Sequence, residues 1–195
     1  MSAINPPFDY ASVHANFSFS VPERFNFAFD IVDQRAQQSD KIALIAINRA
    51  ADAVRYYRYS DLERESNRFA NALLAMGVNK GDAVLVVLPR IAAWYFVILG
   101  CTKIGAVAMP GTNQLKAKDL AYRIHRSDAK IAIVTASHTE AIESIHEHCP
   151  SLKHRIVVGA QRPGWDRFES LCEQADDRLD RSSIPATRSE ETMLS

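Results

Sequence analysis

Ala83-Val-Leu-Val-Val-Leu88 is a run of six apolar residues between the turn Lys80-Gly81-Asp82 and Pro89. A strand buried on both faces has such an uninterrupted apolar sequence, whereas a strand with one solvated face alternates apolar and polar residues. Pro89 has no N–H for a sheet ladder, so the strand should end there. The run therefore predicts an interior strand of a parallel sheet that helices cover on both sides.

Further apolar runs follow at intervals of roughly 22 to 25 residues, a length that accommodates one strand and one crossover helix. They comprise residues 105–109, 130–134 and 155–158. The intervening sequences have helical periodicity at residues 91–104, 116–127 and 139–149. Right-handed crossovers place such helices on both faces of a sheet. The predicted fold class is α/β, with a doubly wound, mostly parallel sheet and helices on both faces.

Two elements are predicted ahead of this sheet. Residues 41–48 and 54–59 alternate and are rich in aromatic and β-branched side chains, which indicates an antiparallel hairpin. From Ser60, apolar residues recur at steps of three and four, and Gly77 is suited to end the resulting helix. Ser60-Asp-Leu-Glu63 is the predicted capping box of this amphipathic helix.

The charge balance limits the classes of partner. Lys plus Arg and Asp plus Glu number 23 each, so no net field attracts nucleic acid or an anionic membrane. Residues 91–110 are almost wholly apolar, but Gly100, Lys103 and Gly105 interrupt them. We interpret this stretch as a buried helix and strand rather than a membrane span. Small molecules or proteins are the expected partners, with no nucleic acid and no membrane span.

The cysteines and the N-terminus bear on the cellular compartment. Three widely separated cysteines without a CxxC pair argue against a disulfide framework and against a zinc site. The first 20 residues have neither the basic region nor the apolar region of a signal peptide. A cytoplasmic location is therefore expected.

Sequence motifs of complete catalytic sites are absent. There is no P-loop, no GxGxxG after a strand, no HExxH and no GxSxG elbow. The six histidines are isolated or point to different sides of a helix, so we interpret them as surface residues. The sequence predicts no catalytic residue and no metal ligand.

The loop Pro110-Gly-Thr-Asn-Gln114 follows the second parallel strand and is the candidate binding site. Ligands of open α/β sheets bind beyond the carboxyl ends of the strands. Gly111 permits close backbone approach, and Thr112, Asn113 and Gln114 offer hydrogen-bonding groups. The same residues could instead form a polar turn that caps the following helix. The pattern alone leaves both interpretations open.

Several further segments share their order and spacing with one family. They are Val21-Pro-Glu-Arg-Phe-Asn-Phe-Ala28, Lys80-Gly81-Asp82, Leu88-Pro-Arg90, Trp94, Lys103-Ile-Gly-Ala106, Met109-Pro-Gly-Thr-Asn-Gln114, Lys118-Asp119-Leu120, Tyr122-Arg123 and Gly164-Trp165. Together they resemble the medium-chain acyl-CoA synthetases, which belong to the adenylate-forming ligases. The resemblance covers nearly the whole chain.

The resemblance implies an AMP-forming ligase reaction with ATP and Mg, followed by acyl transfer to coenzyme A. It also implies that Gln114 contacts coenzyme A, with Thr112 and Asn113 as possible further contacts. The family's Gly-rich phosphate loop, adenine and ribose motifs, hinge and C-terminal domain are not found in these 195 residues. The chain alone is therefore expected to be inactive as a ligase and to bind no cofactor tightly.

The resemblance also suggests how the chain is organised. Residues 1–27 are predicted as an extended N-terminal segment, and residues 28–176 as a partial AMP-dependent synthetase/ligase domain, its N-terminal subdomain. Residues 177–195 lose apolar periodicity and are predicted as a linker toward the missing phosphate loop. A downstream polypeptide that completes the domain is a possible partner. The alternatives are a standalone interaction module or a truncated, non-functional gene product.

Overall fold

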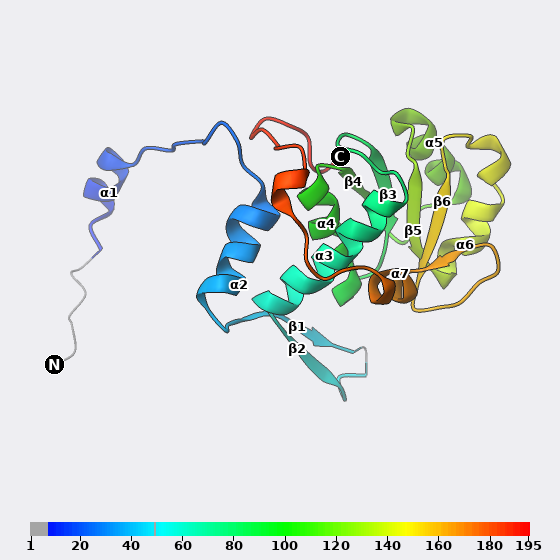
Figure 1. Cartoon of the computed structure of the whole chain (residues 1–195), viewed down its shortest axis with the longest axis horizontal. Helices are drawn as coiled ribbons and strands as arrows, with labels where there is room; N and C mark the ends of the chain where they lie inside the picture. The colour runs from blue at the N-terminus through cyan, green and yellow to red at the C-terminus, as the bar shows by residue number, and fades with distance from the viewer. Residues whose placement is uncertain (1–7, 49) are drawn as a thin grey trace.

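A five-stranded parallel sheet forms the centre of the molecule (Figure 1). Residues 8–48 and 50–195 are described by a computed structural model of the chain. The strands are β3 (Ala83–Val87), β4 (Val107–Pro110), β5 (Ile131–Thr135), β6 (His154–Val158) and β7 (Asp166–Arg167). Their order is β4-β3-β5-β6-β7, and every pairing is parallel. The predicted fold class is confirmed.

The sheet separates two apolar cores because successive residues of a buried strand point to opposite faces. Val84 and Val86 of β3 face one core, and Leu85 and Val87 face the other. The first core is covered by α3 (Tyr59–Ala75), α4 (Ala92–Ile104) and α7 (Phe168–Gln174). The second is covered by α5 (Ala117–Ser127) and α6 (Ala136–Glu143). Helices on both faces explain why β3 is apolar throughout.

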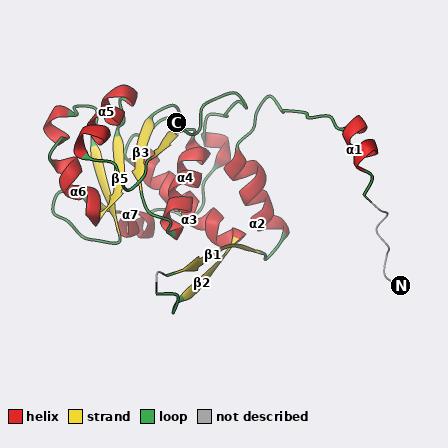
Figure 2. Ribbon diagram, turned by 180° about the vertical axis from the view of Figure 1, so that it is seen from behind, coloured by secondary structure: helices red, strands yellow, loops and turns green. Residues whose placement is uncertain are grey.

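The hairpin is confirmed, and the start of α3 differs from the prediction. Strands β1 (Ile42–Ile47) and β2 (Val54–Arg58) pair antiparallel and extend away from the sheet (Figure 2). The helix begins at Tyr59, and the carboxylate of Asp61 accepts a hydrogen bond of 2.8 Å from the backbone N–H of Arg58. The predicted capping box at Ser60 was wrong because the last residue of β2 leads directly into the helix.

Some elements were not predicted from periodicity. They are α1 (Tyr10–Asn16), a π-helical segment η1 (Ala28–Asp33), α2 (Gln34–Gln38) and α7. Helix α6 ends at Glu143, earlier than predicted, and a 3-10 turn, η2 (His146–His148), follows. Within residues 1–27, residues 1–7 lie outside the described part, and α1 is capped by Asp9, whose carboxylate accepts from Ser12 N–H.

Residues 177–195 run back across the body after a short 3-10 turn, η3 (Arg181–Ser183). Thr187 is buried, and its hydroxyl donates to the carbonyl of Phe25 over 2.9 Å. Beside the edge strand β4, the Ala108 N–H donates to Met193 and the Ala108 carbonyl accepts from Ser195. The segment therefore contacts both the N-terminal part of the chain and the edge of the sheet.

No helix among the described residues is long and apolar enough to cross a bilayer. The apolar stretch of residues 91–110 is divided between α4 and β4, as predicted. In residues 8–48 and 50–195, His, Cys, Asp and Glu side chains form no group of three or more that could hold a metal ion.

Candidate functional site

The carboxyl ends of β4 and β5 lie on either side of β3 and carry the loops that form the candidate site. The chain passes from β3 to β4 at the edge and then returns to β5 on the other side of β3. Such a reversal of strand order opens a crevice at the carboxyl edge, where open α/β sheets bind their ligands. The fold thus brings the loop of residues 111–114 to the edge that the sequence indicated.

Gly111 anchors the start of this loop to the sheet. Its N–H donates to the carbonyl of Val86 over 2.8 Å. A Cβ atom at this position would lie 2.6 Å from Cδ1 of Leu115 and 3.3 Å from Cγ2 of Val87. Since Leu115 packs against the second core, the glycine lets the loop turn tightly over β3. A Cβ at residue 111 would thus meet the chain's own Leu115 side chain.

Thr112, Asn113 and Gln114 are all exposed. The Thr112 hydroxyl oxygen accepts a hydrogen bond of 3.2 Å from the Gln114 backbone N–H, so this bond does not use the Gln114 side chain. The following helix α5 is capped by Asp119, whose carboxylate accepts from Lys116 N–H over 3.0 Å. Because Asp119 supplies the cap, the carboxamide of Gln114 has no structural task in the helix and can meet a ligand.

His138 joins this loop to the end of β5. The imidazole is only 6% exposed, so its interpretation as a surface residue was wrong. Its Nε2 lies 3.1 Å from the carbonyl oxygen of Asn113, and its Nδ1 lies 3.0 Å from Oγ of Ser137. The only signal in the sequence was its position just after a buried strand, because the partner carbonyl is 25 residues away.

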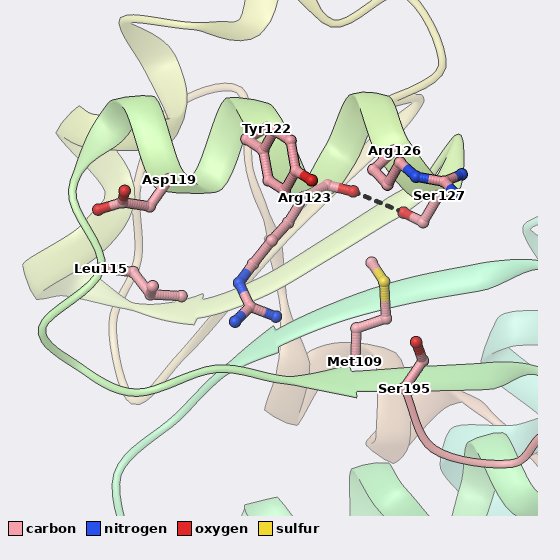
Figure 3. A pocket seen from close by; sticks show the side chains of 8 residues that line it. All are labelled: Met109, Leu115, Asp119, Tyr122, Arg123, Arg126, Ser127 and Ser195. Carbon is pink, nitrogen blue, oxygen red and sulfur yellow. Dashed lines mark hydrogen bonds between the residues drawn. The ribbon is translucent and has the colours of Figure 1, made fainter.

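An open pocket of about 700 Å³ borders the same loop at Leu115 (Figure 3). It is lined by Met109, Leu115, Asp119, Tyr122, Arg123, Arg126, Ser127 and Ser195. The guanidinium of Arg123 extends from α5 toward β4, and the Ser127 hydroxyl donates to the Arg123 carbonyl over 2.8 Å (Figure 3). Guanidinium groups suit phosphate or carboxylate ligands. The site therefore offers uncharged polar groups on the loop, and two guanidinium groups and the Asp119 carboxylate on the flanking helix.

The cysteines lie apart from this chemistry. Cys101, Cys149 and Cys172 are free and buried. Burial raises the pKa of the Cys101 thiol to about 12 and also raises that of Cys172 to about 12. A thiol with such a pKa is not a nucleophile at neutral pH. The three cysteines are therefore core residues and do not contribute to the candidate site.

Known proteins share both this sequence and this fold. The family described as AMP-binding enzyme matches residues 31–193. Mitochondrial acyl-coenzyme A synthetase ACSM1 of Mus musculus is 38% identical over 162 residues, which are 79% of this chain and 28% of that protein. Mitochondrial acyl-coenzyme A synthetase ACSM4 of Homo sapiens is 36% identical over 181 residues, which are 89% of this chain and 30% of that protein.

Two solved structures superpose on most of the chain. The anthranilate CoA ligase AuaEII in complex with anthranoyl-AMP has a TM-score of 0.76 at 26% identity. The match covers 88% of this chain and 31% of the AuaEII chain. Brucella canis acyl-CoA synthetase has a TM-score of 0.78 at 21% identity, which establishes the shared fold, and covers 96% of this chain and 34% of its own.

The sheet, its helices and its hairpin are those of the adenylate-forming ligases. The chain belongs to the AMP-binding enzyme family, and the resemblance to medium-chain acyl-CoA synthetases is confirmed. It spans 28% and 30% of the length of the two curated relatives.

Proposed function

We propose that this chain forms the N-terminal portion of an AMP-forming acyl-CoA synthetase and supplies one edge of its coenzyme A site. The overall reaction would join a carboxylic acid, such as a medium-chain fatty acid, to ATP and then transfer the acyl group from AMP to the coenzyme A thiol. The observation that carries the proposal is the exposed loop of residues 112–114 at the carboxyl edge of a sheet shared with these ligases.

The residues of the loop fit coenzyme A, whose pantetheine and nucleotide parts carry amides, hydroxyls and phosphates. The Gln114 carboxamide has both donor and acceptor atoms and can pair with an amide or a hydroxyl. Thr112 and Asn113 present further polar side chains beside it. Their role would be to orient the coenzyme, since none of them titrates near neutral pH.

For ATP, in contrast to coenzyme A, these 195 residues offer no matching site, because they contain no glycine-rich phosphate loop. We therefore assign no step of adenylation to this chain. The phosphate loop and the C-terminal domain of the family would come from additional polypeptide, and a downstream segment that supplies them is the proposed partner. Mg would be needed with ATP there.

The purified chain is expected to form no acyl-CoA when mixed with a medium-chain acid, ATP, Mg and coenzyme A. The physical reason is that these 195 residues contain no glycine-rich phosphate loop to hold the ATP phosphates and stabilise the charge that develops during adenylation. Thioester formation would be followed by chromatography, with a full-length family member as the positive control. Product above the rate without protein would contradict this part of the proposal.

Coenzyme A at millimolar concentration is expected to shift the amide and carboxamide NMR signals of Gln114 in the isotopically labelled chain. One edge of a divided site provides few contacts, so the dissociation constant should be on the order of 1 mM. Gln114→Ala should reduce the shifts of its neighbours, whereas Gln37→Ala, at an exposed position on α2, should leave them unchanged. Equal shifts in both variants would refute the assignment of Gln114.

We also propose that the protein acts in the cytoplasm, where three free cysteines are compatible with a reducing environment. The names of the mammalian relatives place those proteins in mitochondria. Fractionation of cells that produce the tagged protein decides between the two compartments.

A further inference from the structure

We infer that His138 is a positioning residue that fixes the peptide plane between Asn113 and Gln114 and thereby sets the direction of the Gln114 side chain. The inference rests on the proposed function, because it gives His138 a role in presenting Gln114 to coenzyme A. Nothing in the sequence pattern connected these residues, and the tertiary structure brings them together.

Both polar groups of this peptide unit are held. On one side, the Asn113 carbonyl lies 3.1 Å from Nε2 of His138. On the other, the Gln114 N–H donates to the Thr112 hydroxyl oxygen over 3.2 Å. A peptide unit is planar, so restraining its carbonyl and its N–H restrains rotation of the whole plane. The held plane orients the N–Cα bond of Gln114, and the Leu115 N–H, which donates to the Thr112 carbonyl over 3.3 Å, limits rotation about that bond although the residue itself is exposed.

The hydrogen-bond partners define the tautomer of the imidazole. A carbonyl oxygen can only accept, so Nε2 of His138 must carry the proton and donate to Asn113. In the neutral ring Nδ1 is then an acceptor, and the Ser137 hydroxyl can donate to it. Ser137 Oγ is in turn 3.0 Å from Thr135 Oγ1. Each group can thus donate to the next: Thr135 to Ser137, Ser137 to His138, and His138 to the Asn113 carbonyl of the loop.

The imidazole is well placed to hold an exposed loop because its own surroundings are rigid. His138 lies in the first turn of α6, directly after the buried strand β5. The next residue, Thr139, is fully buried, and its hydroxyl donates to the carbonyl of Ala136 over 2.9 Å. The hydrogen bond therefore connects the loop to the sheet interior, and its loss should loosen the loop more than the core.

The test is NMR spectroscopy of the labelled chain and of two variants. The ring nitrogen signals of the native protein should show the Nε2-protonated tautomer of His138. His138→Leu should speed amide exchange of Gln114. It should also raise the dissociation constant of coenzyme A about threefold to tenfold, the equivalent of one hydrogen bond. In His138→Gln the carboxamide can again donate to the Asn113 carbonyl. This variant should recover much of the slow Gln114 exchange and much of the affinity for coenzyme A.

The outcomes separate this inference from the proposed function. An Nδ1-protonated ring, or unchanged Gln114 exchange in His138→Leu, overturns the positioning role whatever the ligand. If native protein shows no response to coenzyme A but the tautomer and exchange results hold, the proposed ligand fails and the positioning role stands. If coenzyme A affects His138→Leu and native protein equally, the positioning role fails and the ligand stands.

A second variant covers the case in which His138→Leu does not fold. Thr112→Val removes the acceptor of the Gln114 N–H from an exposed position. It should speed exchange at Gln114 while the His138 ring signals keep the Nε2-protonated pattern. Unchanged exchange in this variant would show that the peptide plane is not held at its N–H and would overturn the inference.

Discussion

Lys103→Met is expected to lower the free energy of unfolding by about 3–5 kcal/mol, because it leaves a buried carboxylate without its cation. The Lys103 side chain is fully buried in α4, and its Nζ lies 2.9 Å from Oδ1 of Asp33, which is 10% exposed. Nζ also donates to Oδ1 of Asn67 over 2.5 Å and to the carbonyl of Glu63 over 3.4 Å. One ammonium group therefore forms an ion pair with a carboxylate of η1 and donates hydrogen bonds to two acceptors of α3.

Burial works against both charges of this pair. It lowers the pKa of Lys103, although Asp33 and Glu63 oppose that effect. It raises the pKa of Asp33 in spite of the neighbouring Lys103 and Arg181. Since the cost of desolvation is large for each ion, the pair is stabilising only in comparison with a single unpaired charge.

Three comparisons distinguish this explanation from a general loss of packing. Asp33→Leu alone should be as harmful as Lys103→Met, whereas the double variant should recover much of the loss. Arg167→Met, which breaks a partly exposed pair with Glu169, should cost about 0–1 kcal/mol. Unfolding in urea at pH 7, followed by circular dichroism, gives each value. A Lys103→Met variant within 1 kcal/mol of the native protein would contradict the argument.

The Lys103 cluster illustrates what the sequence could and could not predict. The apolar runs predicted the parallel strands and the helices between them, because burial on both faces leaves a local pattern. Lys103 appeared as an interruption of one apolar stretch and as the first residue of one family segment, and neither observation pointed to its partner. Its partner Asp33 is 70 residues away, in a π-helical segment whose residues have no simple periodicity. Long-range ion pairs of this kind leave no signal in a single sequence.

The candidate site was predictable to a similar extent. The position of the loop before Leu115 followed from the general rule for open α/β sheets, and Gln114 from the family resemblance. His138 was not predictable, since its burial depends on how α6 packs beside that loop. Helix α7 was also missed, although its residues Phe168 and Cys172 complete the first core. It is only seven residues long, which is too short for periodicity to be recognised.

Phe69→Ala is expected to lower the free energy of unfolding by about 3–5 kcal/mol, the usual range for removing a buried phenylalanine. Phe69 is fully buried in α3, and its ring lies 5.3 Å from that of Phe168 in α7. It also fills space left by a glycine, because a Cβ at Gly100 of α4 would lie 2.8 Å from Cδ1 of Phe69. The ring thus contacts two other helices of the first core.

The loss of stability in Phe69→Ala should appear first in one part of the molecule, which hydrogen exchange can detect. Removing the ring leaves a cavity that borders α4 and α7, and the short α7 then keeps only its packing against β6 and β7 at full strength. Its amides should therefore lose protection before those of β3 and β5. Phe19→Ala, at a side chain that is 79% exposed, should change the free energy of unfolding by less than about 0.5 kcal/mol. If Phe69→Ala cost no more than this control, the α3–α4–α7 contact would not stabilise the first core, and packing of α7 against β6 and β7 would have to hold that helix instead.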